Sequence, residues 1–408
     1  MTIHSKLALA AGIAALVDVS AASAQQFNAP GQVEISGRTF HVAVCPGPAA
    51  RGTARCFAHV VTDSRGNPLT STVTRNATPS GYGPAQLRGA YGINPASGMP
   101  GTGATVAIVD AYGYPSAASD LATYRGQFGL GSCTTSNGCL TIVNENGGPN
   151  LPRSNTGWDQ EQALDLDMVS TMCPNCKILL VQASSSSFAD LAAAANYAGM
   201  HAHVVSNSYG GGENGSNTYE ASYNHNGVAV TASTGDSGFG AQFPATSPHV
   251  IAVGGTTLHL TGSNTRQSET AWSGGGSGCS TLYNEPSWQL PSNANMTTNT
   301  LCTMRMEADV SADADPNTGV AVYGPANRRG SAWLVFGGTS VAAPLIGGIF
   351  GEKNNAVNFA QTIYTNSSSL FDVTSGTNGS CGGTYFCVAG PHYDGPTGLG
   401  TPNGDTAF

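Results

Sequence analysis

Charged side chains are scarce in this sequence, because only 10% of its 408 residues are Asp, Glu, Lys or Arg. Basic residues are the scarcer kind, with 15 Lys and Arg against 24 Asp and Glu. No basic patch of the type that nucleic-acid-binding proteins carry is visible, so we expect no nucleic-acid partner. A small number of basic groups also limits self-repulsion when carboxylates become protonated, which favours a protein that works in acid.

Long apolar runs are rare as well, and the one present lies at the N-terminus. Lys6 precedes an apolar run from Leu7 to Val17, and Ala22-Ser23-Ala24 has the small-residue pattern of a cleavage site. The run is too short for a membrane-spanning helix. We interpret residues 1–24 as a secretory signal peptide and expect a secreted, extracellular or periplasmic protein without membrane association after cleavage. A retained anchor is the minor alternative, because the basic region is thin.

The sequence has no unpaired extra cysteine, because the count is even, and it has no second C-x-x-C motif. An even count in a secreted chain favours disulfides. The ten cysteines fall into five pairs that are close in sequence: Cys45/Cys56, Cys133/Cys139, Cys173/Cys176, Cys279/Cys302 and Cys381/Cys387. The third pair has the spacing of a redox motif or of half a zinc site. Nothing completes the zinc site, so we expect a disulfide there too.

The most informative motif present is Phe336-Gly337-Gly338-Thr339-Ser340, which small residues follow up to Pro344. Two glycines allow a substrate to approach the backbone closely, and the small residues fit the start of a helix. A serine at that position lies beside backbone N–H groups and the positive end of the helix dipole, which favour an oxyanion. The pattern indicates a nucleophile, although a Thr/Ser helix cap after a glycine turn has the same appearance.

A histidine base for this serine is missing. None of the nine histidines lies in a His-Gly-Thr helix start of the subtilisin kind. Carboxylates are better candidates, because residues 158–169 have apolar residues at helical spacing, and Glu161 and Asp165 are four residues apart. On a helix both would project from one face and share a proton. The alternative is an ordinary solvated acidic face of the helix. Two like charges four residues apart, with no Lys or Arg between them, destabilise a helix and so make this alternative less favourable.

A third acidic candidate is Asp236, in Thr234-Gly235-Asp236-Ser237-Gly238. It directly follows an apolar, β-rich stretch that is typical of a buried strand. Functional groups in α/β folds lie just beyond the ends of such strands. Asp-Ser-Gly is also an ordinary turn, so the motif carries weight only in combination.

Together these motifs resemble the sedolisin family, the serine-carboxyl peptidases with a subtilisin-like fold. The resemblance extends from Tyr82 to the C-terminus and keeps the order of the motifs. The matching segments are Glu161 to Asp165, Ser206-Asn207-Ser208-Tyr209-Gly210, Gly235 to Gly238, Gly338 to Pro344, Val109 to Gly113, Ala271 to Gly276 and Thr397 to Pro402. The resemblance implies that Ser340 is the nucleophile, Glu161 its general base, Asp165 the carboxylate that orients Glu161, and Asp236 the oxyanion stabiliser.

The resemblance also implies one structural Ca²⁺ ion near the C-terminus. Its ligands would be the carboxylates of Asp372 and Asp394 and the carbonyls of Val373, Gly390 and His392, since oxygen ligands suit Ca²⁺. His392 replaces a residue that is usually glycine in the family, so a backbone angle tolerated only by glycine would be disturbed there. A pair of Asx turns is the alternative interpretation.

The expected fold class is α/β: a subtilisin-like layered fold with a mostly parallel central sheet flanked by helices, preceded by a short β-leaning N-terminal segment. Residues 25–80 form this segment, a short prosegment or retained domain that ends in a linker from Leu69 to Ser80. Residues 81–408 form the peptidase domain with the calcium region. Strands are expected near 104–109, 178–182, 203–206 and 228–232, and helices over 117–128 and 188–200.

The partners that follow are peptide or protein substrates, and we expect a monomer. Two other classes remain open: a catalytically inactive secreted binding module on the same fold, and a histidine-dependent subtilisin-type protease. The complete set of Ser and acidic residues argues against the first, and the histidine inventory argues against the second. Asp110, at the end of the first core strand, lacks a partner histidine and is interpreted as structural.

Overall fold

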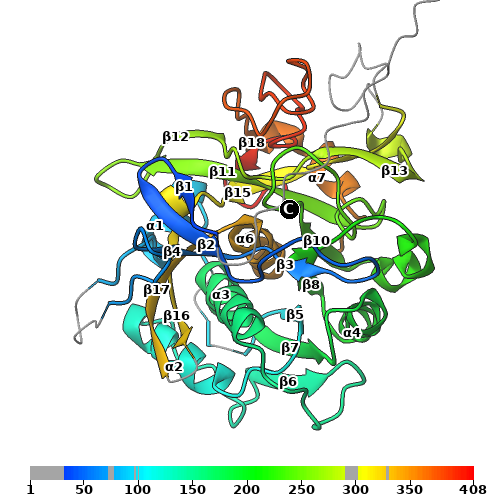
Figure 1. Ribbon diagram of the computed structural model, residues 1–408. Coiled ribbons are helices and arrows are strands. Elements are labelled where there is room, and N and C mark those ends of the chain that lie inside the picture. The colour runs from blue at the N-terminus through cyan, green and yellow to red at the C-terminus, as the bar shows by residue number, and fades with distance from the viewer. Residues whose placement is uncertain (1–31, 72–77, 96–97, 100, 290–301, 328–329) are drawn as a thin grey trace, which may run out of the picture.

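The computed structural model describes residues 32–71, 78–95, 98–99, 101–289, 302–327 and 330–408 (Figure 1). The predicted signal peptide, residues 1–24, lies outside the described residues, and so do residues 72–77 of the predicted linker. Among the helices in the described ranges, none combines the length and the apolar character needed to cross a membrane.

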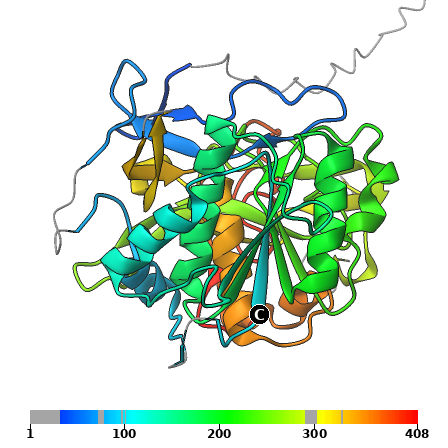
Figure 2. The same ribbon diagram turned by 90° about the horizontal axis from the view of Figure 1, so that it is seen from below.

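The centre of the fold is an eight-stranded, mostly parallel sheet with the strand order β12-β11-β10-β8-β5-β7-β6 and with β15 beside β11 (Figures 1 and 2). Only β12 runs antiparallel to its neighbour. The strands are β5 (Thr105–Ala111), β6 (Leu140–Asn144), β7 (Lys177–Ala183), β8 (Val204–Asn207), β10 (Ala229–Ser233), β11 (Ile251–Leu260), β12 (Arg266–Ala271) and β15 (Val310–Asp313). The four strands predicted from sequence are β5, β7, β8 and β10, so the expected sheet is confirmed.

Helices cover both faces of this sheet (Figure 2). Their bounds are α1 (Pro84–Tyr91), α2 (Ala117–Phe128), α3 (Thr156–Met172), α4 (Phe188–His201), α6 (Thr339–Lys353) and α7 (Gln361–Thr365). Alternate residues of β5 explain the layers. Val106 and Ile108 belong to the apolar cluster that contains α3 and α6, whereas Ala107 and Val109 belong to the cluster that contains α4. The α/β layered fold is therefore as predicted.

The N-terminal segment is built into a second sheet rather than set apart. Its strands β1 (Glu34–Ser36), β2 (Thr39–Ala43) and β4 (His59–Thr62) join β17 (Gly330–Gly337) and β16 (Val320–Asn327) in the order β1-β2-β4-β17-β16. In Figure 1 the blue N-terminal strands accordingly lie beside the golden β17 and β16. Because β17 leads directly into α6, this sheet brings the N-terminal segment to the start of that helix.

Short strand pairs complete the structure. They are β3 (Arg55–Cys56) with β9 (Tyr209–Gly210), β13 (Gly278–Asn284) with β14 (Met304–Glu307), and β18 (Leu370–Phe371) with β19 (Thr401–Pro402). All five cysteine pairs proposed from proximity are disulfide-bonded: Cys45–Cys56, Cys133–Cys139, Cys173–Cys176, Cys279–Cys302 and Cys381–Cys387. The bond between Cys45 and Cys56 fixes the loop that precedes β4.

Candidate active site

Ser340 lies at the N-terminus of α6, as the glycine-rich motif predicts. Gly338 caps the helix with φ 102°, a backbone angle that favours glycine. It also allows a close approach, because a Cβ atom on Gly338 would lie 1.9 Å from the carbonyl oxygen of Phe57. The Ser340 side chain is fully buried, and its hydroxyl donates to the Ser208 carbonyl at 3.2 Å.

Glu161 and Asp165 lie one turn apart on α3, whose start is capped by the Asn155 side chain. Both carboxylates are fully buried. Ser208 Oγ donates to Asp165 Oδ1 at 2.8 Å, and the Ala58 amide donates to Glu161 Oε2 at 2.9 Å. Among the described residues, neither Glu161 Oε1 nor Asp165 Oδ2 has a hydrogen-bond partner. The solvated acidic face that the sequence left open is therefore not what the structure has.

Burial raises the pKa of Glu161 well above its usual range, and the negative charge of Asp165 raises it further. The Ser340 hydroxyl opposes this shift, so the serine lies close to the carboxylate although it donates to Ser208 in this structure. Burial also raises the pKa of Asp165, against the hydrogen bond from Ser208. Since two such groups do not ionise together cheaply, the pair retains a proton in acid.

Asp236 follows β10 at the same end of the sheet, beside the start of α6. Its Oδ1 accepts hydrogen bonds from the Thr339 amide at 2.8 Å and from Thr339 Oγ1 at 2.7 Å. Burial raises the pKa of Asp236 to about 7, against these two bonds. Its Oδ2 lies 2.5 Å from the point where a Gly338 Cβ would be, and therefore faces the turn before Ser340. A protonated Asp236 can donate there to an oxyanion.

Asp110 joins this group, although the sequence suggested only a structural role. It is fully buried near the carboxyl end of β5, and neither of its oxygens has a hydrogen-bond partner among the described residues. Burial raises its pKa, and the charges of Asp165 and Glu161 raise it further. The position at the end of a parallel strand, which pointed to Asp236, was the available signal for Asp110 as well.

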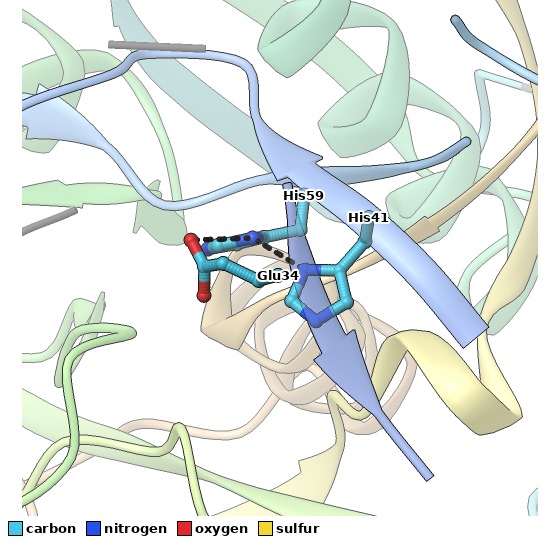
Figure 3. A group of neighbouring side chains, drawn as sticks. All are labelled: Glu34, His41 and His59. Atoms are coloured by element: carbon cyan, nitrogen blue, oxygen red, sulfur yellow. Dashed lines mark hydrogen bonds and ion pairs between the residues drawn. The ribbon is translucent and has the colours of Figure 1, made fainter. Parts of the chain in front are cut away.

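Three further side chains that sequence reasoning missed, those of Glu34, His41 and His59, lie together (Figure 3), and His59 contacts Asp236. His59 Nε2 is 3.4 Å from Asp236 Oδ2, and His59 Nδ1 is 2.9 Å from His41 Nδ1. Glu34 Oε1 lies 4.0 Å from His59 Nδ1. Burial lowers the pKa of His59 well below its usual range and that of His41 to about 4. A neutral His59 therefore borders Asp236 Oδ2 in weak acid.

Glu34, His41 and His59 have ligand atoms within 4.8 Å of one another, so a metal ion has to be considered. Tetrahedral zinc with bonds of ~2.05 Å separates two nitrogen ligands by roughly 3.4 Å. The observed separation of 2.9 Å between the two Nδ1 atoms is that of a hydrogen bond between neutral rings. The geometry fits a histidine pair better than a metal site.

The five residues predicted to bind calcium come together in two adjacent loops. The His392 amide donates to Asp372 Oδ2 at 2.7 Å, and Thr397 Oγ1 lies 3.5 Å from the Val373 carbonyl. Asp394 is buried, and burial raises its pKa to about 7, with a smaller contribution from the charge of Asp372. A cation would relieve this buried negative charge, so the donor set fits Ca²⁺.

The sequence suggested that His392 would disturb a backbone angle tolerated only by glycine, but the backbone there has φ 71°, in the left-handed region that favours glycine. The Gly390 amide donates to Asp394 Oδ2 at 2.9 Å, so the loop also satisfies one carboxylate without an ion. His392 therefore adopts the required conformation rather than changing the loop.

The arrangement as a whole defines a class of site: a serine hydroxyl at a helix N-terminus, on a subtilisin-like α/β fold, with carboxylates where a histidine base would otherwise stand. The family model described as "Subtilase family" matches residues 141–367, which include Glu161, Asp165, Asp236 and Ser340. The calcium loops lie beyond that match.

Comparisons with individual proteins place the chain more narrowly within the subtilases. Kumamolisin of Bacillus sp. (strain MN-32) is 30% identical over 365 residues, which cover 81% of this chain and 64% of that protein. Sedolisin of Pseudomonas sp. (strain 101) is 32% identical over 182 residues, 40% of this chain and 29% of that protein. The solved structure of Pseudomonas sedolisin, a serine-carboxyl proteinase complexed with pseudo-iodotyrostatin, superimposes with a TM-score of 0.64 at 26% identity over 80% of this chain and 96% of that chain.

The chain therefore belongs to the subtilase family and, within it, to the sedolisins. It spans less than two thirds of the length of the two curated relatives named above.

Proposed function

We propose that this protein is a secreted serine-carboxyl peptidase that hydrolyses peptide bonds in acid. The observation that supports this most is the convergence of Ser340, Glu161, Asp165 and Asp236 in one buried site, with the pKa of each of the three carboxyl groups raised above its usual range. Carboxyl groups that hold protons in weak acid can perform the acid–base steps that histidine performs near neutrality.

In the proposed mechanism, the Ser340 hydroxyl turns from the Ser208 carbonyl toward Glu161, which removes its proton as Ser340 Oγ attacks the substrate carbonyl carbon. Protonated Asp236 donates through Oδ2 to the developing oxyanion. Asp165 and Ser208 keep Glu161 in position and limit its charge. Glu161 then transfers the proton to the leaving amine, and a water molecule releases the acyl group by the reverse sequence.

We also propose one structural Ca²⁺ ion at the C-terminal loops, bound by the carboxylates of Asp372 and Asp394 and by the carbonyls of Val373, Gly390 and His392. The ion would neutralise two carboxylates and tie the two loops together. It would supply stability and take no part in the chemistry.

Hydrolysis of a peptide library in acid tests the proposed function. Ser340→Ala and Glu161→Gln should each abolish turnover without a change in fold, because the residues act as one unit. Ser263→Ala, which changes an exposed serine, is the matched control and should keep the wild-type rate. If Glu161→Gln retained that rate, the assignment of the base would be wrong. If the wild-type protein cleaved no peptide at any pH, it would be an inactive binding module on this fold.

A further inference from the structure

A segment of the chain itself, residues 55–59, passes through the active site. Arg55–Cys56 (β3) pairs antiparallel with Tyr209–Gly210 (β9), and the Phe57 amide donates to the Ser208 carbonyl at 3.3 Å. The segment is therefore held as an added strand, in the way that an extended peptide ligand binds the edge of a sheet. β9 immediately follows Ser208, which is a neighbour of the nucleophile and of Asp165.

The nucleophile lies against Phe57. Ser340 Oγ accepts a hydrogen bond of 3.2 Å from the Phe57 amide. The Phe57 carbonyl oxygen packs on Gly338, since a Cβ atom there would lie 1.9 Å from this oxygen and 2.5 Å from Asp236 Oδ2. The Phe57 carbonyl oxygen and the Asp236 carboxyl group, which is proposed to stabilise an oxyanion, thus both lie beside Gly338.

The nitrogen on the other side of that carbonyl faces the general base. The Ala58 amide donates to Glu161 Oε2 at 2.9 Å, while Glu161 Oε1 has no hydrogen-bond partner among the described residues. One oxygen is thus available for the Ser340 proton, and the carboxylate already contacts the nitrogen that would leave. Nucleophile, base and oxyanion carboxyl all meet the peptide bond between Phe57 and Ala58.

The side chain of Phe57 occupies a pocket lined by glycines. It is 1% exposed, and a Cβ atom on Gly210 would lie 2.8 Å from its ring. The Cys45–Cys56 disulfide constrains the residue before Phe57, and the Ala58 carbonyl accepts from the Val44 amide at 3.0 Å. The bond is therefore fixed on both sides, in a register set by the fold.

We propose that Phe57–Ala58 is the bond that this active site cleaves in its own chain, and that the segment ending at Phe57 blocks the cleft until then. This inference rests on the proposed peptidase function. Ser340 Oγ forms a bond to the Phe57 carbonyl carbon, the C–N bond to Ala58 breaks, and Glu161 transfers the Ser340 proton to the Ala58 nitrogen. Water then hydrolyses the ester, which leaves a carboxylate on Phe57 and restores Ser340. The pocket also assigns a preference for an aromatic residue before the cut.

This position differs from the linker at Leu69 to Ser80, which ends the N-terminal segment predicted from sequence. Residues 69 and 71 pair with Val61 and Trp333 through backbone hydrogen bonds. Those bonds lie in and beside the second sheet, whereas Phe57 and Ala58 contact Ser340 and Glu161 directly.

The test incubates the full chain in acid and maps every new terminus by intact mass and N-terminal sequencing, while hydrolysis of an added peptide with an internal phenylalanine is followed in the same samples. We expect a new N-terminus at Ala58, a partner fragment that ends at Phe57, and a rate on the added peptide that rises as these fragments appear. Ser340→Ala should remain intact.

Ala58→Pro removes the N–H that contacts Glu161 and should prevent this cut, whereas Thr70→Pro, at an exposed linker position, should leave it unchanged. Should Ala58→Pro fail to fold, the mapped terminus of the unmodified chain still decides the matter. If the protein hydrolyses the added peptide but its own chain is cut at another bond, or is not cut, the inference is overturned and the proposed function stands. A chain that cleaves neither itself nor the peptide overturns both.

Discussion

Replacement of Asp236 by Asn should separate its role as an oxyanion donor from its titration. Oδ1 of Asp236 accepts two hydrogen bonds from Thr339, and these fix which oxygen points at the turn before Ser340. In Asp236→Asn the amide oxygen can keep both bonds, so the amide nitrogen takes the place of Oδ2. An amide N–H donates at any pH, whereas the carboxyl group donates only when it is protonated.

The magnitude follows from a pKa of about 7 for Asp236, which burial raises from its usual value. Below that pKa the carboxyl group is protonated and competent. At pH 8 only about one molecule in eleven retains the proton, and each further pH unit costs the wild type about tenfold in kcat/KM. In the mature enzyme, water in the cleft would lower the pKa, because desolvation is the main cause of the shift. The upper limb of the pH profile should therefore lie at or below neutrality.

The assay is hydrolysis of a synthetic peptide by processed enzyme between pH 3 and pH 9, with circular dichroism as the check on folding at each pH. Asp236→Asn should remain active and lose the wild-type fall at high pH. Asp236→Ala, which offers no donor, should fall about 10²–10³ below the wild type in kcat at acid pH, where the wild-type carboxyl group is protonated. An Asn variant whose rate falls with pH as in the wild type, or that is as poor as the Ala variant, would refute the oxyanion role.

Two further predictions concern stability. Saturating Ca²⁺ should stabilise the protein by about 3–4 kcal/mol and raise the thermal midpoint by several degrees relative to chelator, an effect that Asp394→Asn should abolish; identical melts in a protein shown to contain no metal would reject the site. Asp309→Ala should cost about 3–5 kcal/mol in chemical unfolding, because Arg305 and Asp309 form a fully buried pair with bonds of 2.8 Å and 2.5 Å. A loss below ~1 kcal/mol would show that the remaining Arg305 finds other partners.

Local sequence signals predicted the elements of this fold well because each signal acts over a few residues. The apolar spacing over 158–169 indicates a helix, and the structure has α3 (Thr156–Met172), capped by Asn155. That helix alone sets the four-residue relation between Glu161 and Asp165. The glycine turn before Ser340 is an equally local device, so both halves of the candidate site could be named before the fold was known.

The contacts that close the site could not be predicted, because they join residues far apart in the chain. Arg55-Cys56-Phe57-Ala58-His59 has no periodicity that points to residue 161 or 340, yet it fills the space between them. From sequence, Asp110 is interpreted as structural because it lacks a partner histidine. Its carboxylate neighbours, Asp165 and Glu161, become visible only when α3 packs on β5. Burial, which sets the pKa of all these groups, is a property of the assembled layers.

The pairing of β2 with β4 has a consequence for how the peptidase would be switched on. Thr39–Ala43 and His59–Thr62 are hydrogen-bonded neighbours in one sheet, yet a cut after Phe57 assigns them to different chains. Both Cys45 and Cys56 remain on the released piece, so no covalent bond retains it. Before the cut the blocking strand has a high effective concentration, and afterwards its return depends on dilution. At high concentration the cleaved fragment would stay bound and inhibit the enzyme, and dilution alone would make the fragment dissociate and restore activity.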